Sequence, residues 1–109
     1  MAYDEGLAQR IREALEERDD VVEKKMFGGL CFMLHGNMCV GIVKDELMVR
    51  VGPDSYEKAL KRKHAREMDF TGRSMKGFVY VAVEGFESDR DLERWIALGA
   101  DHADTLPPK

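Results

Sequence analysis

The chain has 109 residues and a net charge of −4, with 44% hydrophobic and 35% charged residues. These values are typical of one globular domain and exclude a disordered tail. No apolar run reaches the roughly 20 residues of a membrane span, and the N-terminus lacks the basic start and apolar stretch of a secretion signal. We therefore expect a cytoplasmic protein with no membrane partner. The acidic charge argues against broad binding to nucleic-acid phosphates.

The N-terminal third predicts a helix followed by a strand. The helix covers about residues 4–18, with Asp4 as its N-cap and apolar residues at helical spacing. Because its apolar stripe is narrow, we expect it to cover a sheet. The strand covers residues 21–27, and Gly28-Gly29 then introduces a bend or bulge.

The most hydrophobic stretch, residues 26–51, predicts an antiparallel meander. Residues 30–34 and 38–43 are apolar on both faces, which indicates strands covered on both sides or facing a partner. His35-Gly36-Asn37 is the expected turn between them, and a third strand follows to Val51. This register places Cys31 and Cys39 diagonally on one sheet face, roughly 7–8 Å apart and too far for a disulfide.

The second half predicts a short helix over residues 53–61 and a short strand around Met68 and Phe70. Gly72 and Gly77 are expected to bracket a turn, a strand covers residues 78–83, and a last helix runs from the N-cap Ser88 to about residue 103. The predicted fold is α+β: an antiparallel sheet of about five to six strands and three helices, two layers, in the order α-β-β-β-β-α-β-β-α. Without a repeat or linker, residues 1–109 are expected to form a single domain.

The sequence carries no recognisable catalytic motif. His35, His64 and His102 are not spaced with each other, or with cysteines and carboxylates, as metal ligands are. The serines have turn or cap explanations. We therefore predict no enzyme activity, no cofactor and no metal site.

One set of residues suggests a site for a small anionic ligand or a nucleotide. Arg50 and the pair Arg73 and Lys76 would supply positive charge to a carboxylate or phosphate. Glycines would permit close approach of the backbone. The hypothesised ligand-binding residues are Gly28, Gly29, Arg50, Arg73 and Lys76. The alternative, which we favour, is that Arg73 and Lys76 pair with nearby carboxylates and fix a loop.

Positive charge is concentrated in residues 58–76. One hypothesis for this segment is direct nucleic-acid binding through a local basic face on an acidic body. The residues of this hypothesis are Lys61, Arg62, Lys63 and Arg66. The alternative, a solvated helix end and loop, is favoured.

The chain resembles the N-terminal domain of TfoX/Sxy-type competence regulators. The resemblance rests on Met26-Phe27-Gly28-Gly29 and on Phe70-Thr71-Gly72-Arg73 with Met75-Lys76-Gly77, and it extends from about Lys24 to the end. It implies a two-layer fold similar to type III secretion chaperones, in a bacterial cytoplasmic protein associated with transcription regulation of DNA-uptake genes. Two-domain members carry a further C-terminal domain, whereas we expect this chain to be a stand-alone N-terminal domain, and no catalytic residues carry over.

Together these observations favour a non-enzymatic regulatory or adaptor domain that acts through protein–protein contacts. The protein partner is not identified. A homodimer through an edge strand or an exposed sheet face is a further hypothesis, since an antiparallel sheet must protect its edges. Small-ligand binding and nucleic-acid binding are the alternatives.

Overall fold

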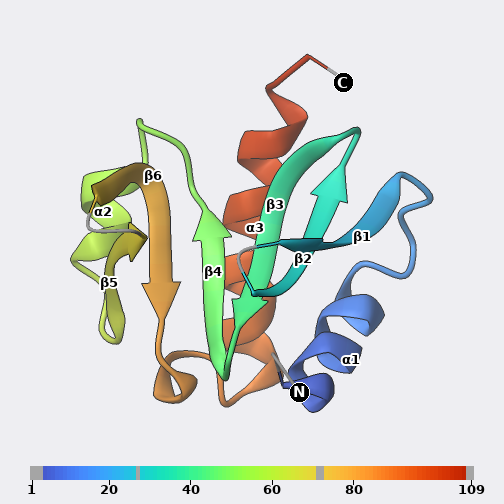
Figure 1. The fold of residues 1–109 in the computed structure, drawn as a ribbon, viewed down its shortest axis with the longest axis horizontal. Coiled ribbons are helices and arrows are strands. Elements are labelled where there is room, and N and C mark those ends of the chain that lie inside the picture. Colours follow the sequence, from blue (N-terminus) through green and yellow to red (C-terminus); the bar gives the residue numbers. More distant parts are fainter. Residues whose placement is uncertain (1–3, 27, 71–72, 108–109) are drawn as a thin grey trace.

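The computed structural model describes residues 4–26, 28–70 and 73–107. Within them the elements follow the predicted order α1-β1-β2-β3-β4-α2-β5-β6-α3 (Figure 1). Their bounds are α1 Glu5–Ala14, β1 Val21–Met26, β2 Gly29–Leu34, β3 Asn37–Val43, β4 Glu46–Arg50, α2 Tyr56–Leu60, β5 Ala65–Phe70, β6 Arg73–Val81 and α3 Asp89–Asp104. A 3₁₀ turn, Val83–Gly85, precedes α3. The α+β class and the six-stranded sheet are confirmed.

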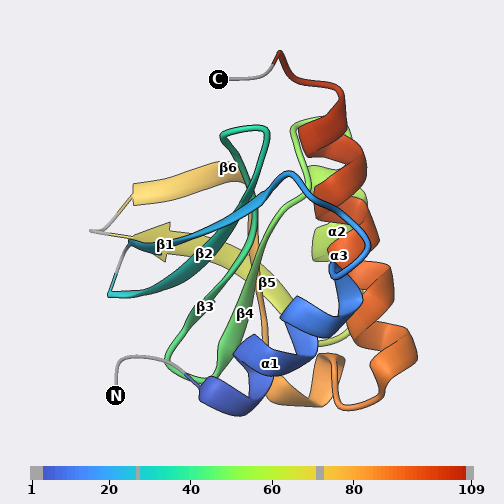
Figure 2. The ribbon, with the colours of Figure 1, turned by 90° about the vertical axis from the view of Figure 1, so that its right-hand side faces the viewer.

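The sheet has the strand order β1-β2-β3-β4-β6-β5, with every neighbouring pair antiparallel. All three helices lie on one side of it, so the fold has two layers (Figure 2). β1 and β5 are the edge strands. Among the described residues, no helix combines the length and apolarity needed to cross a bilayer.

The long helices begin where the sequence predicts. The Asp4 carboxylate accepts hydrogen bonds from the amides of Gly6 and Leu7 at 2.9 and 3.2 Å, and the Ser88 hydroxyl accepts one from Asp91 at 3.1 Å. Each cap satisfies amides that have no partner within the helix. Helix α1 ends at Ala14, four residues before the predicted end, with Leu15 as its C-cap.

The β2–β3 hairpin differs from its prediction by one residue. Its turn is His35-Gly36, both with positive φ (53° and 82°), and Asn37 already pairs with Leu34. A register shift follows, so that Phe32 pairs with Val40 but Met33 pairs with Met38. Cys39 is the extra residue of this bulge.

The bulge corrects the predicted arrangement of the cysteines. Cys39 lies in the core between sheet and helices, whereas Cys31 lies on the opposite face. Both are free and buried, and burial raises the pKa of Cys31 to about 11 and of Cys39 to about 12. They act as small apolar side chains, as predicted, but on opposite sides of the sheet.

The largest structural difference from the prediction lies in β5 and β6. Ala65–Phe70 forms a six-residue strand where only a short one was expected, and the predicted turn from Gly72 to Gly77 is replaced by the first part of β6. These strands pair with each other over most of their length. Cross-strand hydrogen bonds to a strongly β-forming segment, residues 78–81, therefore override the weak local preference of the charged segment.

Helix α3 packs unusually close to β3 at Gly99. A Cβ added at Gly99 would lie 2.6 Å from the carbonyl oxygen of Cys39 and 3.2 Å from Val40 Cγ1. The missing side chain thus lets the helix backbone rest on the bulge. Around this contact the core collects side chains from the sheet and helices: Leu7, Ile11, Leu34, Val40, Ile42, Leu47, Val49, Val79, Val81, Leu92, Trp95 and Ile96.

We predict that Gly99→Ala destabilises the protein by about 1–3 kcal/mol, because the new methyl group overpacks a backbone contact. This outweighs the helix propensity gained, at most about 1 kcal/mol. The free energy of unfolding is measured by urea denaturation. Gly6→Ala, in the first turn of α1, is the control: its added Cβ meets only the exposed Asp4 carboxylate, at 3.2 Å, so helix propensity should offset the contact and stability should fall by no more than about 0.5 kcal/mol. A Gly99→Ala protein as stable as the control would contradict the close packing.

Candidate interaction face

The sheet face that carries no helix is apolar across its centre. Strand pairing places one residue from each strand in a single row across this face: Lys24, Cys31, Gly41, Met48, Tyr80 and Arg66. Cys31, Met38, Met48 and Tyr80 are buried here, with Met33, Val43 and Phe78 packed against them and partly exposed. We call these seven apolar residues the open-face cluster. The two-sided apolar pattern of residues 30–34 and 38–43 predicted that this second face is covered or meets a partner.

Two arginines lie over aromatic rings of the open-face cluster. Arg50 Cζ lies 5.6 Å from the centroid of the Phe78 ring, and Arg66 Cζ lies 4.8 Å from that of Tyr80. Arg66 also donates two hydrogen bonds to the Glu46 carboxylate, which lowers the pKa of Glu46. Stacking on rings therefore holds guanidinium groups at the surface of an otherwise apolar face.

The structure separates the members of the predicted anionic-ligand site. Gly29 lies beside Val43, and a Cβ there would collide with the Ile42 carbonyl, so close strand packing explains this glycine. Arg50 pairs with Phe78, at the other end of the central strands. Gly28 adjoins Gly29 and has positive φ (74°). The glycine pair and Arg50 are therefore not brought together.

The remaining members of that set are Arg73 and Lys76. Their backbone belongs to β6 and not to a turn. Their side chains lie outside the described residues, as does Gly72. A ligand-binding role for these two residues stays a prediction.

The basic segment does not present one continuous face. The Arg62 guanidinium stacks over the Trp95 ring in the helical layer, with Cζ 4.3 Å from the ring centroid. Arg66 lies over Tyr80 on the opposite face of the sheet. Lys61 and Lys63 are exposed. Nucleic-acid binding by these four residues stays a prediction, and two of them, Arg62 and Arg66, already stack on aromatic rings of the protein itself.

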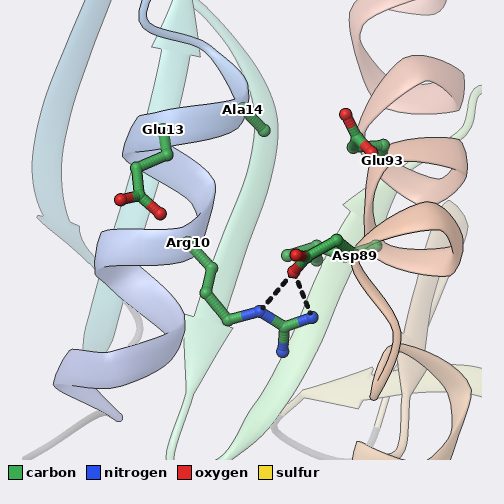
Figure 3. Close-up of a pocket in the computed structure, with 6 residues that line it drawn as sticks. Arg10, Glu13, Ala14, Asp89 and Glu93 are labelled. Atoms are coloured by element: carbon green, nitrogen blue, oxygen red, sulfur yellow. Dashed lines mark hydrogen bonds and ion pairs between the residues drawn. The ribbon is translucent and has the colours of Figure 1, made fainter.

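A pocket of about 200 Å³ lies between α1 and α3 (Figure 3). Arg10 reaches across it and donates to Asp89 at 3.2 Å, and also to the carbonyl oxygens of Phe86 and Glu87 at 2.8 and 3.2 Å. Glu13 and Glu93 complete its charged lining. Because Arg10 already bonds three acceptors, this pocket fastens α1 to the start of α3.

A cluster of polar residues lies at the C-terminal end of α3. It connects Asp104 of this helix with the segment between α1 and β1 and with the β2–β3 turn. Arg18 donates to Asp20 at 3.0 Å and to Asp104 at 2.8 Å, and His35 Nε2 lies 2.7 Å from Asp20. One ligand atom each of Asp20, His35 and Asp104 falls within 4.8 Å of the others, a spacing that would suit a metal. Arg18 already hydrogen-bonds both carboxylates, so its positive charge offsets part of the negative charge that would attract a cation.

The other two histidines, His64 and His102, are not part of this polar cluster. His102 packs directly against Gly52, where a Cβ would collide with the imidazole and where φ is +85°. Burial, and then the nearby Arg50 charge, lowers the pKa of His102, which favours the neutral ring. His64 is exposed.

Sequence spacing could not reveal the polar cluster, because its four residues come from positions 18, 20, 35 and 104. The open-face cluster did leave a signal, since its strands lack polar alternation. Lys24 was missed as a neighbour of this face. The signal was its position two residues after Val22, which places both side chains on one face of a strand. That face is the open one, because Val22 pairs with Met33 and Lys24 pairs with Cys31.

The polar cluster should make stability fall in acid. The Arg18 hydrogen bond lowers the pKa of Asp20. Its stabilising effect is therefore complete above the unfolded pKa of about 4 and is lost as pH falls through the lower folded value. We predict that Asp20→Asn flattens the decline of the unfolding free energy between about pH 5 and about pH 2.

Urea denaturation at several pH values measures this decline. Asp19→Asn is the matched control, because Asp19 is exposed and takes part in none of these contacts. Identical pH profiles for Asp20→Asn and Asp19→Asn would show that the cluster does not contribute.

Comparison with known proteins yields one family. Searches among curated proteins and among solved structures give no significant match. The family model of the TfoX N-terminal domain matches residues 13–103, a range that contains the sheet and nearly all of α3. This match covers most of the chain, so the protein belongs to the TfoX N-terminal domain family.

Proposed function

We propose that this chain is a non-enzymatic regulatory or adaptor domain that acts by contact with another protein. The observation that carries the proposal is the open-face cluster, which no helix covers and in which Met33, Val43 and Phe78 remain partly exposed. Beside it, Val22 on the edge strand β1 is 56% exposed. Apolar side chains of this kind, left partly exposed, commonly mark contact sites.

Family membership supports the regulatory part of the proposal. A TfoX N-terminal domain is consistent with a competence-regulator-like protein, and we place its action in the cytoplasm. Contact with a protein fits the structure better than the two alternatives. Arg50 is distant from the glycine pair, and Arg62 and Arg66 are stacked on the protein's own rings.

A second copy of the chain is a further partner that the edge strand supports. β1 pairs only with β2 among the described strands, which leaves its outer edge for another strand. Its exposed residues Glu23, Lys24 and Lys25 include both signs of charge. Two antiparallel copies of β1 could therefore place opposite charges across from each other.

The proposal predicts site-specific crosslinking at the helix-free side of the sheet. The photo-crosslinker benzoylphenylalanine in place of Val22 should form protein adducts in the native cell. The same group in place of Ala97, exposed on α3, is the control and should form few. Adduct masses are measured on denaturing gels, and sedimentation of the purified protein identifies adducts that are dimers.

Nuclease treatment separates the protein proposal from nucleic-acid binding. Adducts at position 22 should survive nuclease and be digested by protease. If positions 22 and 97 crosslink equally, or if the position 22 adducts disappear with nuclease, the proposed contact face is wrong.

A further inference from the structure

We propose that the open-face cluster binds an acidic amphipathic helix of a partner protein. The apolar stripe of that helix would lie on Met33, Val43 and Phe78, and its flanking carboxylates would meet Lys24 and Arg50. This inference rests on the proposed function and specifies the chemistry of the partner. Shape, side-chain composition and charge each contribute to it.

The sheet has a shape that suits a helix. Its outer strands on both sides project away from the three helices, so the helix-free face is bounded by β1 and β2 on one side and by β5 and β6 on the other (Figures 1 and 2). From β2 to β6 there are three strand steps, or about 14 Å at the usual strand spacing. A helix with its side chains is about 10–12 Å wide. One helix therefore fits between these walls, as the chain's own helices fit on the other face.

The composition of the face favours a protein over nucleic acid. Cys31 and Met48 are already buried, at 1% and 0% exposure, so the contact falls to the side chains that surround them. Those are Met33, Val43 and Phe78, partly exposed. Flexible thioethers and aliphatic groups adapt to apolar side chains. Nucleobases would require several aromatic platforms, and among these three residues Phe78 alone is aromatic.

The charge of the face is opposite to that of the whole chain. Strand pairing assigns the described charged side chains Lys24, Arg50 and Arg66 to this face, with Glu46 as the one carboxylate among them. Glu23 and Glu67 pair with Phe32 and Val79 and so belong to the helical side. Glu46 is bonded to Arg66. Lys24 and Arg50 therefore give the open face a positive rim on a protein of net charge −4.

The rim cations lie at two different borders of the apolar patch, Lys24 at its β1 side and Arg50 at the end of the central strand β4. Lys24 is exposed on β1 beside Cys31, and Arg50 lies partly exposed over Phe78 between β4 and β6. A helix with apolar residues at i, i+3, i+4 and i+7 carries its polar residues along both borders of that stripe. Glutamates on the border that faces β1 would meet Lys24, and those near the end of β4 would meet Arg50, whereas lysines at these positions would be repelled.

The test measures binding of the full chain to designed peptides by fluorescence anisotropy. The probe is a fluorescein-labelled amphipathic helix of about 18 residues, with leucine on one face and glutamate along both borders. Its partner probe has lysine in place of every glutamate. We expect micromolar binding of the glutamate peptide and at least roughly tenfold weaker binding of the lysine peptide.

Charge-reversal variants locate the site. Lys24→Glu with Arg50→Glu should weaken binding of the glutamate peptide at least roughly tenfold. Lys58→Glu with Lys61→Glu makes the same charge change at exposed positions near α2 and should change binding less than about twofold. Circular dichroism and thermal unfolding confirm that both variants remain folded.

Several results would overturn the inference. These are equal binding of the two peptides, equal effects of the two double variants, or tighter binding of a labelled single-stranded oligonucleotide that competes with the peptide. A dimer that Lys24→Glu with Arg50→Glu dissociates would assign the face to a second copy instead. If position 22 still crosslinks a protein while the glutamate peptide fails to bind, the proposed contact function stands and the acidic-helix inference is wrong.

Discussion

The fold depends on a mismatch between its central strands and its helices. β2, β3 and β4 carry apolar side chains on both faces, yet all three helices cover the same face. The covered face forms a conventional core, closed by the backbone contact of Gly99 with the Cys39 bulge. The other face has to exclude water with its own side chains. It does so by curvature, by large side chains such as Met48 and Tyr80, and by guanidinium groups laid over the rings.

The bulge at Cys39 decides which side chains of β3 lie on each face of the sheet. The register predicted with a three-residue turn would place Cys39 on the open side with Cys31, whereas the two-residue turn and the bulge place it in the core, toward α3. Because side chains alternate with a period of two, one inserted residue reverses every assignment on one side of it. Met38 thereby joins the open-face cluster and Val40 stays in the core. A two-residue turn with two positive φ values was enough to cause this, and the turn residues His35-Gly36-Asn37 alone allowed either length.

Periodicity and capping predicted the element order, both long helices and the six-stranded sheet, because those signals are local. They failed where pairing between strands decides. The charged start of β5 is a strand because it pairs with residues 79–81, and the first residues of β6 in turn pair with the end of β5. The candidate site shows the same limit. The sequence allows Gly28, Gly29 and Arg50 to form one site. Strand order and register, however, place the two glycines and Arg50 at opposite ends of the central strands. The polar cluster of Arg18, Asp20, His35 and Asp104 is equally invisible to spacing.

The electrostatic argument for the open face depends on distance. At physiological salt, charges more than about 8 Å apart are largely screened, so an approaching partner responds to the local side chains more than to the net charge of −4. Within that range Glu46 is occupied by Arg66, whereas Lys24 and Arg50 border the apolar patch. A guanidinium already resting on Phe78 has lost part of its hydration and part of its rotamer freedom. Folding has therefore already restricted the Arg50 side chain, so a carboxylate that binds it causes little further loss of conformational entropy. This favours a carboxylate-bearing partner over water.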